Sequence, residues 1–423
     1  MSFKYGGKMN YFNNVEKIKN SLIEQEKLFD ETLILNPVEN LPNPEILKPC
    51  SSFMHGLYNT DSLRTPSQKI DTKIQFSGRT QIAEEINEIY CDWAKLLKAE
   101  KLSMRYLSGL HAHIVILMSI SEIGQRIMAL PEKAGGHLSS YAIIKRLGLE
   151  VKDIPYDSSN KCIDRQKCIE EIEAFKPDII FVYRSEGLVY EDFSWLGSIE
   201  TQFPCYKIFD ASQYLTNIIC QDYINPFDMG FDLILSTMHK NLPGPQRALV
   251  CSKKDDEMWK RLKSGTSTYV SNMHVFSIYS AGLLLEDMDK LKYLSKNMLI
   301  NASLLDSELQ KRGLPVVGRN CNNLNPPTHH CWICFDNKKT SFKLFDNLER
   351  IGLMTNYRLL PYDLGYGLRL GLSGATQSGL KAKDIPELAN IIAQAYNSGY
   401  STTLFKETKE WIKTIKKQVD TYD

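Results

Sequence analysis

The sequence predicts an α/β protein that has a large domain with a mostly parallel sheet and a smaller α/β domain at its C-terminal end. Three observations support this fold class. With 423 residues, the chain is longer than one hydrophobic core usually holds. Short apolar runs alternate with helical patterns between Glu150 and Ser252, which is typical of parallel strands covered by helices on both faces. From about Ser303 the pattern changes to two further strand-like runs and two helices.

The elements are expected in the following order. Val15, Ile18, Leu22 and Phe29 fall on one helical face, which predicts an N-terminal amphipathic helix. A second helix is predicted from Gln81 to Lys98. The strands that follow are "EVKDIPY", "DIIFVYRS", "YKIFD", "DLILST" and "RALVCS". The C-terminal part reads as the strands "HHCWICFD" and "GLRLGLS" and helices over Ile385 to Tyr396 and Leu404 to Val419. We therefore expect an N-terminal helix and arm (1–50), a large domain (51–290) and a small domain (291–423).

Composition and charge argue against a nucleic-acid or membrane partner and favour a reduced, cytoplasmic location. The 51 basic and 50 acidic residues give a net charge of +1 without a basic or acidic block, which argues against nucleic acid or an anionic membrane surface. The first residues, "MSFKYGGKMNYFNN", lack the apolar core of a signal peptide, and the longest apolar run, "IVILM", is too short to span a bilayer. The ten cysteines show no disulfide spacing pattern, which favours reduced thiols and a cytoplasmic location.

A lysine placed just after a buried strand is the main chemical signal. In "STMHKNLPGP", Lys240 follows the apolar run "DLILS", and thirty residues upstream Asp210 ends the run "YKIFD". Ligands of open α/β sheets gather at the carboxyl ends of the strands. A lysine and an acid so placed suit pyridoxal phosphate (PLP): the lysine forms a Schiff base, and the acid keeps the pyridine nitrogen protonated so that the ring accepts electrons.

Two further segments have the order and spacing that such a site needs. In "YLSGLHAH", Ser108 and Gly109 open a helix whose N-terminal amides suit a phosphate. In "AGGHLSSYAIIKRLG", His137 begins a helix that Gly148 ends, so its imidazole is placed to stack on a cofactor ring. Each motif taken alone is more often ordinary helix capping.

Together these segments resemble the serine hydroxymethyltransferase branch of the fold-type-I PLP enzymes, from about Leu33 to Gly379. The resemblance implies a seven-stranded, mostly parallel sheet. It also implies roles for single residues: Lys240 as the Schiff-base lysine, Thr237 and His239 beside the cofactor, Ser108 and Gly109 at the phosphate, His137 on the ring and in catalysis, Ser185 near the phenolic oxygen, Asp210 at the ring nitrogen, and Arg369 at the substrate carboxylate. An arginine fork also suits a carboxylate on chemical grounds alone.

The departures from that family pattern concern proton transfer and folate. The segment that carries the catalytic glutamate of the family reads "FMHG" here, with His55 at the glutamate position. Gln213 replaces a cofactor-binding histidine, and Gln246 replaces an arginine. Val38 replaces a polar residue, an extra stretch follows from Asn59 to Ile74, and the loop "YRLLPYDLGYGL" that borders the folate pocket is short.

His55, the extra stretch and Gln246 make the chain more similar to the L-threonine transaldolases, which share the scaffold, whereas Gln213 and Val38 depart from that subgroup as well. That subgroup has a histidine in the "FxH" segment, an insertion after it and an "HK-x-x-PGPQ" motif, and "HKNLPGPQ" fits this form. Transaldolases release acetaldehyde from L-threonine and add the remaining glycine carbanion to another aldehyde without folate. The resemblance thus implies an amino acid and an aldehyde as small-molecule partners. It also implies a homodimer with shared active sites, in which His55 and the backbone around Tyr269 and Val270 reach the neighbouring subunit's site.

Three functions are compatible with the sequence. The first is an aldol-type enzyme that makes or cleaves the Cα–Cβ bond of a β-hydroxy amino acid, with Lys240, His55 and His137 as catalytic residues. The second is another PLP enzyme on the same scaffold: a folate-dependent hydroxymethyltransferase, an aminotransferase, a racemase or a decarboxylase. The third is a non-enzymatic scaffold protein, which the joint presence of Lys240, Asp210, His137 and Arg369 disfavours.

Two other motifs allow alternative interpretations. "HHCWICFD" invites a metal or redox role for Cys331 and Cys334, but residues three apart in a strand point to opposite faces, so we expect a core strand and no metal. His111 and His113 lie one turn into a helix and either reach the substrate or serve as polar residues at an interface.

Overall fold

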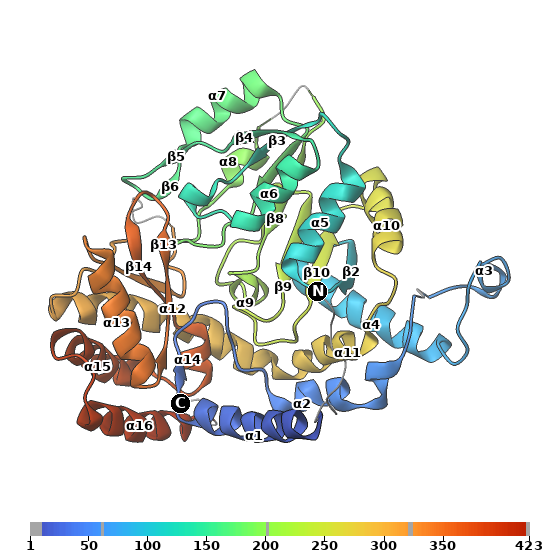
Figure 1. Ribbon diagram of the computed structural model, residues 1–423. Helices are drawn as coiled ribbons and strands as arrows, with labels where there is room; N and C mark the ends of the chain where they lie inside the picture. Colours follow the sequence, from blue (N-terminus) through green and yellow to red (C-terminus); the bar gives the residue numbers. More distant parts are fainter. Residues whose placement is uncertain (1–10, 61–62, 200–202, 320–324, 420–423) are drawn as a thin grey trace, which may run out of the picture.

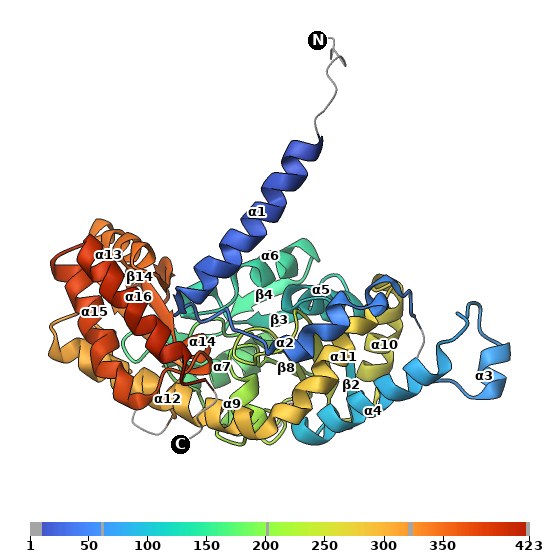
Figure 2. The same cartoon turned by 90° about the horizontal axis from the view of Figure 1, so that it is seen from below.

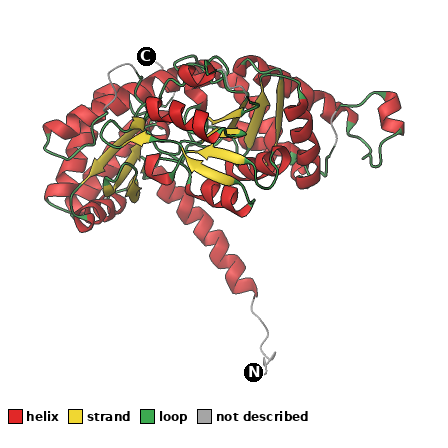
Figure 3. Cartoon of the chain, turned by 90° about the horizontal axis from the view of Figure 1, so that it is seen from above, coloured by secondary structure: helices red, strands yellow, loops and turns green. Residues whose placement is uncertain are grey.

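The computed structural model describes residues 11–60, 63–199, 203–319 and 325–419. It has a large domain built on a seven-stranded sheet and a smaller C-terminal domain built on a three-stranded sheet (Figure 1). In Figure 3 the strands lie inside the molecule and the helices surround them. The α/β fold class predicted from the sequence is confirmed. The first ten residues, on which part of the signal-peptide argument rests, lie outside the described residues.

The seven-stranded sheet is mostly parallel, as expected. Its strands, in spatial order, are β2 (Lys101–Tyr106), β10 (Ala248–Ser252), β9 (Leu233–Thr237), β8 (Tyr206–Asp210), β7 (Ile179–Val182), β3 (Arg126–Ala129) and β4 (Glu150–Asp153). Only β10 runs antiparallel to its neighbours, and the other six strands run in one direction. Every residue of β7, β9 and β10 is buried. Strands covered on both faces read as continuous apolar runs, which is why the sequence revealed them.

Helices cover both faces of this sheet. They are α4 (Thr80–Leu97), α5 (Gly109–Ile120), α6 (Leu138–Arg146), α7 (Arg165–Phe175), α8 (Ser194–Gly197), α9 (Leu215–Ile219), α10 (Glu257–Tyr269) and α11 (Val275–Leu283). α5 packs against α6 and α10 on one face, and α4 packs against α9 and α11 on the other (Figure 2). The buried Trp93 of α4 donates its indole N–H to the Ala281 carbonyl at 3.0 Å and so fixes α4 to α11. A short β5–β6 ribbon (Tyr156–Asp157, Cys162–Ile163) lies outside the sheet.

The small domain is a three-stranded antiparallel sheet with helices. Its strand order is β11 (His330–Cys334), β14 (Gly365–Gly371) and β13 (Asn356–Leu360), and its helices are α13 (Lys338–Arg350), α14 (Ser373–Gln377), α15 (Ile385–Asn397) and α16 (Thr402–Lys416). The long helix α12 (Met288–Lys311) belongs to both domains. Leu291 and Met298 pack in the large-domain core, whereas Leu305 and Leu309 pack in the small-domain core. The domain boundary near residue 290 stays a prediction.

The N-terminal helix forms as predicted, but its contacts with α16 are made at its C-terminal end, where Lys416 donates to the Phe29 carbonyl and lies 5.6 Å from the Phe29 ring. α1 (Tyr11–Asp30) projects away from both domains (Figure 2), and its residues 14–30 are all exposed. The apolar side chains of Val15, Ile18, Leu22 and Phe29 are between 43% and 61% exposed. After α1 the chain returns to the small domain, where β1 (Leu33–Ile34) pairs in parallel with β12 (Leu353–Met354).

The rest of the N-terminal segment crosses to the large domain. It contains α2 (Pro44–Leu47), two 3₁₀ turns (Lys48–Ser51 and Phe53–Gly56) and α3 (Pro66–Ile70). α3 belongs to the stretch identified as extra in the sequence, and it projects beyond the β2 edge of the sheet (Figure 1). Residues 61–62 of that stretch lie outside the described residues.

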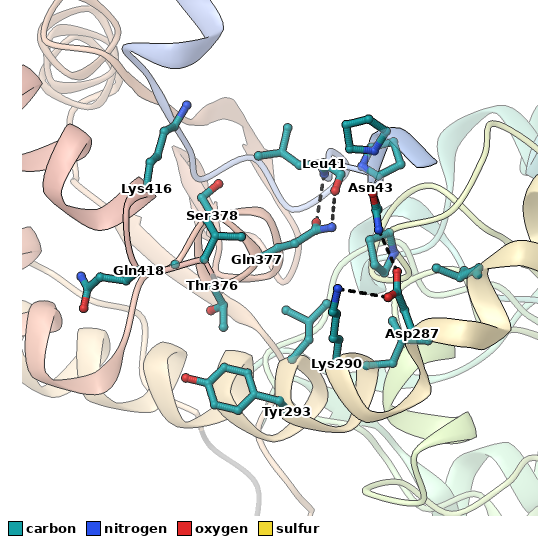
Figure 4. A pocket seen from close by; sticks show the side chains of 18 of the residues that line it. Leu41, Asn43, Asp287, Lys290, Tyr293, Thr376, Gln377, Ser378, Lys416 and Gln418 are labelled. Carbon is teal, nitrogen blue, oxygen red and sulfur yellow. Dashed lines mark hydrogen bonds and ion pairs between the residues drawn. The ribbon is translucent and has the colours of Figure 1, made fainter. Parts of the chain in front are cut away.

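A cavity of about 510 Å³ lies where the N-terminal segment, α12 and the small domain meet (Figure 4). Gln377 at the end of α14 accepts from the Leu41 amide at 3.0 Å and donates to the Leu41 carbonyl. Asn43 donates to Asp287 at 3.2 Å, and Lys290 lies 3.3 Å from the same carboxylate. These polar contacts hold the N-terminal segment against both domains. Lys240, Asp210 and Arg369 are not among the residues that line this cavity.

Gln377 offers a test of this junction. Gln377→Ala leaves both backbone groups of Leu41 without their partner, so it should lower the free energy of unfolding by about 1–2 kcal/mol. Gln394→Ala, at an exposed position of α15, is the control and should change it by less than about 0.5 kcal/mol. Urea unfolding of both variants provides the measurement. Equal stabilities would show that the Gln377 contacts do not hold the segment in place.

Candidate active site

Five of the residues predicted to act together lie at or after the carboxyl ends of parallel strands. Asp210 is the last residue of β8, and Lys240 lies three residues after β9. Ser108 follows β2, Ser185 follows β7, and His137 comes after β3. Because these strands run in the same direction, their carboxyl ends meet at one edge of the sheet, where ligands of such folds bind. The topology therefore brings these five residues to one edge.

The loop that carries Lys240 is held tightly from several sides. The Gly244 amide donates to the Met238 carbonyl at 2.8 Å, and a Cβ at position 244 would lie 2.6 Å from that oxygen. Only glycine therefore allows the turn, which explains the "PGP" sequence. Asn40 of the N-terminal segment donates to the Lys240 carbonyl at 3.0 Å and also to the Leu242 carbonyl. The Lys240 backbone is thus fixed while its side chain is left to reach a ligand.

The environment of Lys240 favours the neutral amine. Burial lowers the pKa of Lys240; Asp210 opposes this shift and Arg369 adds to it. A lysine acts as a nucleophile toward a carbonyl only when its amine is unprotonated, and a lowered pKa makes that form more available. Lys240 therefore has the chemistry that Schiff-base formation requires.

Asp210 is buried but remains a strong acid. Its Oδ1 accepts from the Ser212 amide at 2.8 Å and from the Ser212 hydroxyl at 2.5 Å, and its Oδ2 accepts from Nε2 of His113 at 2.9 Å. Burial alone raises the pKa of Asp210, but His113, Lys240 and Ser212 together lower it to about 2. A carboxylate has about four acceptor positions. Three are used, and the fourth, on Oδ2, is left for a protonated ring nitrogen.

His137 is a neutral imidazole at the start of α6. Burial, with smaller contributions from His113 and Lys240, lowers the pKa of His137 to about 4. Its amide donates to the Tyr183 carbonyl at 3.3 Å, which ties the turn before α6 to the segment after β7. That turn needs Gly135, whose φ is 86° and where a Cβ would lie 2.1 Å from the Glu186 carbonyl oxygen. A neutral, fixed imidazole is suited to stacking on an aromatic ring.

The start of α5 and the end of β9 form a cradle that fits a phosphate. The Ser108 hydroxyl caps α5 by accepting from the His111 amide at 3.2 Å. At Gly109 a Cβ would lie 2.6 Å from Cγ2 of Thr237, so glycine permits the close approach of helix and strand. Among the buried side-chain atoms without a hydrogen-bond partner in the described chain, three lie on the segments that carry Asp210 and Lys240: Oγ1 of Thr237, Nε2 of Gln213 and Nδ1 of His239. Such unpaired groups await a polar ligand, so the residues fit PLP.

Arg369 is buried on β14 and already faces a carboxylate. Its Nε donates to Asn356 at 3.2 Å and its Nη1 to the Ser185 carbonyl at 3.3 Å. Oε1 of Glu186 lies 3.7 Å from the same Nη1 and is paired more closely with Arg358. Burial lowers the pKa of Arg369 and Glu186 opposes the shift, so the guanidinium is partly compensated before any substrate binds.

His55, Cys331 and Cys334, which the sequence analysis also named, do not lie at the strand ends that carry Asp210 and Lys240. His55 is exposed on the turn Phe53–Gly56, where its ring lies 4.6 Å from that of Phe276. The predicted strand β11 places Cys331 in the small-domain core, and the thiol of Cys334 contacts the Leu364 carbonyl at 3.0 Å.

In the described part of the chain, no group of three or more His, Cys, Asp and Glu residues is placed to hold a metal ion. No helix among the described residues has both the length and the apolar character needed to cross a membrane.

The structure adds three contacts at the site that the sequence did not reveal. Asn40 holds the Lys240 loop, Glu186 faces Arg369, and His113 contacts Asp210. The two interpretations of His113 as a substrate contact or an interface residue do not fit its position, because it is 2% exposed and paired with a carboxylate inside the large domain. The only indication in the sequence that His113 belongs to the site is its position in "SGLHAH", one turn after the start of the helix.

The fold and this edge of the sheet define a PLP-dependent enzyme of fold type I. Comparison with known proteins narrows the class. The family model described as serine hydroxymethyltransferase matches residues 16–392, and the chain belongs to the serine hydroxymethyltransferase family. The chain is 25% identical to the serine hydroxymethyltransferase of Picrophilus torridus over 92% of its length and 90% of that protein. It is also 25% identical to the Pyrococcus furiosus enzyme, over 91% of each chain.

A solved structure is similar over nearly the whole chain. The crystal structure of L-threonine transaldolase from Pseudomonas fluorescens, in its internal aldimine state, superposes with a TM-score of 0.87. The similarity covers 98% of this chain and 94% of that one, at 20% identity. At this identity the likeness shows the fold that the two proteins share.

The identity of the cofactor lysine can be tested directly. We expect the purified protein to bind PLP, turn yellow and, after borohydride reduction, carry the label on the peptide that contains Lys240. Lys240→Arg should abolish both the colour and the label, because the guanidinium is not deprotonated in proteins. Peptide mass mapping provides the measurement. A label on any other lysine would overturn the assignment.

Proposed function

We propose that this protein makes or cleaves the Cα–Cβ bond of a β-hydroxy amino acid without folate, as a transaldolase or aldolase. The observation that carries the proposal is the histidine at position 55, where the folate-dependent pattern has a glutamate. The form "HKNLPGPQ" at the lysine and the short loop before Arg369 support it. L-Threonine, L-serine and glycine are the amino acids expected to bind, and an aldehyde is the expected second substrate.

Each residue of the site has a distinct part in this proposal. Bound PLP supplies the electron sink that stabilises a carbanion at Cα. Lys240 holds the cofactor, Asp210 keeps its ring nitrogen protonated, and His137 covers one face of the ring. Arg369 binds the substrate carboxylate, which takes over from Glu186 as the partner of the guanidinium. Ser108, Gly109, Thr237, His239, Gln213 and Ser185 bind the remainder of the cofactor.

His55 is proposed to move the proton of the β-hydroxyl group. Histidine is the side chain that most often serves as a general acid or base in catalysis. Breaking the Cα–Cβ bond of a β-hydroxy amino acid requires removal of that hydroxyl proton, and the reverse addition requires its return. Neither step requires a one-carbon carrier. The histidine can therefore serve an aldol reaction for which no pterin pocket is needed.

We further infer that the active unit is a homodimer with shared sites. His55 is exposed, and Phe53 beside it is 81% exposed. Tyr269 on α10 and Leu110 on the adjacent helix α5 are 41% and 37% exposed. The apolar face of α1 is also uncovered. Single exposed apolar residues are normal, but this many on α1, α5, α10 and the His55 turn suit a second copy of the chain.

A cytoplasmic location is part of the same proposal. All cysteines in the described chain are free thiols, and the cytoplasm keeps thiols reduced.

The reaction should proceed without folate. We expect L-threonine to release acetaldehyde, a second and bulkier aldehyde to stimulate turnover, and tetrahydrofolate to have no effect. The assay couples aldehyde release to an alcohol dehydrogenase, with and without folate and acceptor.

Two results would replace this proposal. If L-serine is turned over only with tetrahydrofolate, the protein is a hydroxymethyltransferase, which is the second candidate that its named relatives favour. If no β-hydroxy amino acid is cleaved but a keto acid, an amine or the opposite enantiomer forms, the protein is an aminotransferase, a decarboxylase or a racemase.

The role of His55 across the dimer gives a second test. His55→Ala should slow cleavage by about 10²–10⁴-fold, the usual effect of losing one acid–base group. Lys240→Ala should be inactive. When the two variants are unfolded together and refolded, half of the dimers should combine one chain of each. Each such dimer has one complete site, so we expect about a quarter of wild-type activity. If mixing restores none, His55 does not act on the neighbouring subunit.

A further inference from the structure

We propose that His113 is a positioning residue for the cofactor: it keeps the Asp210 carboxylate ionised and correctly oriented, so that the PLP ring nitrogen remains protonated. This inference rests on the proposed contact between Asp210 and the ring nitrogen. It assigns a role to a residue of α5 whose contact with Asp210 the sequence did not reveal.

The contacts of His113 leave its imidazole no freedom to turn. Nε2 lies 2.9 Å from Oδ2 of Asp210, and Nδ1 lies 2.6 Å from the hydroxyl of Ser140. The ring is packed against Phe181 and Tyr183, at centroid distances of 4.9 and 5.8 Å. The residue is 2% exposed, so water cannot replace either partner. Both ring nitrogens are therefore committed to named protein atoms.

Proton accounting fixes the direction of the first contact. An ionised carboxylate only accepts hydrogen bonds, so Nε2 of His113 must carry a proton and donate it to Asp210. This donor supports the negative charge directly, and His113 is the first factor that lowers the Asp210 pKa against the effect of burial. Hydrogen bonds to the charged form of an acid stabilise that form. Without this donor, the buried carboxylate would accept hydrogen bonds only from the amide and the hydroxyl of Ser212 in the described chain.

Ser140 extends this network to the ring that is proposed to cover the cofactor. Its hydroxyl also lies 3.2 Å from Nδ1 of His137. When His113 carries a single proton, on Nε2, Ser140 must donate to Nδ1 of His113 and can accept from Nδ1–H of His137. The free lone pair of His137 is then on Nε2. One chain of hydrogen bonds thus links the residue below the ring nitrogen to the residue over the ring face.

Two substitutions at position 113 separate the two contacts of the imidazole. The amide nitrogen of Gln occupies roughly the place of Nε2, so His113→Gln retains a donor toward Asp210. The shorter side chain of His113→Asn can reach only the place of Nδ1, so it retains the Ser140 contact and loses the Asp210 contact. Both are polar and neither is larger than histidine, which makes them a matched pair. Ser119→Ala, at another position of α5, is the control for changes in that helix.

The measurement uses the holoenzyme reconstituted with PLP that is ¹⁵N-labelled at the ring nitrogen. The ¹⁵N chemical shift reports whether this nitrogen is protonated, and equilibrium dialysis of the same proteins gives the Kd of PLP. We expect wild type, Ser119→Ala and His113→Gln to have a protonated ring nitrogen. In His113→Asn the nitrogen should be largely unprotonated and the Kd should rise about 10- to 100-fold, as expected for the loss of a charge-assisted hydrogen bond.

A folded His113→Asn variant with a protonated ring nitrogen and an unchanged Kd would overturn the inference. If this variant does not fold, His113→Phe provides the same loss of donor while filling the space beside Phe181 and Tyr183. A merely structural role would change thermal stability in both Gln and Asn variants without a selective change in the ¹⁵N shift, and that result also contradicts the inference.

Asp210→Asn distinguishes this inference from the proposed site itself. If Asp210→Asn leaves the ring nitrogen protonated, the assignment of Asp210 to that nitrogen is wrong, and the inference falls with it. If Asp210→Asn removes the proton but His113→Asn does not, the site stands and only the role of His113 is rejected.

Discussion

The common direction of six strands in the seven-stranded sheet is the constraint on which the site depends. No two of Ser108, His137, Ser185, Asp210 and Lys240 are adjacent in sequence, yet each lies at or after the end of a strand at the same edge. The antiparallel strand β10 does not contribute to this group. Instead it inserts between β2 and β9, where its buried residues join the two strands that lead to the start of α5 and to Lys240. The common direction of the six strands therefore determines both how the core packs and which side chains meet at the site.

A buried carboxylate then decides the electrostatics of that edge. The cost of burying the charged Asp210 carboxylate is offset by hydrogen bonds, because donors from its own turn and from α5 surround it. The negative charge opposes the effect of burial on Lys240, and the same lysine helps to hold the Asp210 pKa near 2. Arg369 is compensated in a similar way by Glu186, whose carboxylate lies 3.7 Å from its guanidinium. The site is thus charged but internally balanced.

Sequence patterns predicted the buried half of this architecture well, for a physical reason. Strands such as Ile179–Val182 and Leu233–Thr237 are apolar at nearly every position because both faces are covered. β2 and β3 were not singled out, since Lys101, Arg105 and Arg126 interrupt their apolar pattern at half-buried positions. The N-terminal helix was predicted correctly, but its sequence could not show that its apolar side chains are between 43% and 61% exposed in the described part of the chain. The contacts of His113 with Asp210 and of Asn40 with Lys240 were missed because they span 97 and 200 residues, a separation at which no local pattern exists.

A crystal structure of the protein grown with PLP would show whether these strand ends form one cofactor site. We expect density continuous with Nζ of Lys240, the ring nitrogen at the open position of Asp210 Oδ2, the His137 imidazole on one ring face and the phosphate at the start of α5. A cofactor bound elsewhere, for example in the cavity between the N-terminal segment and α12, or with its ring nitrogen away from Asp210, would contradict the account.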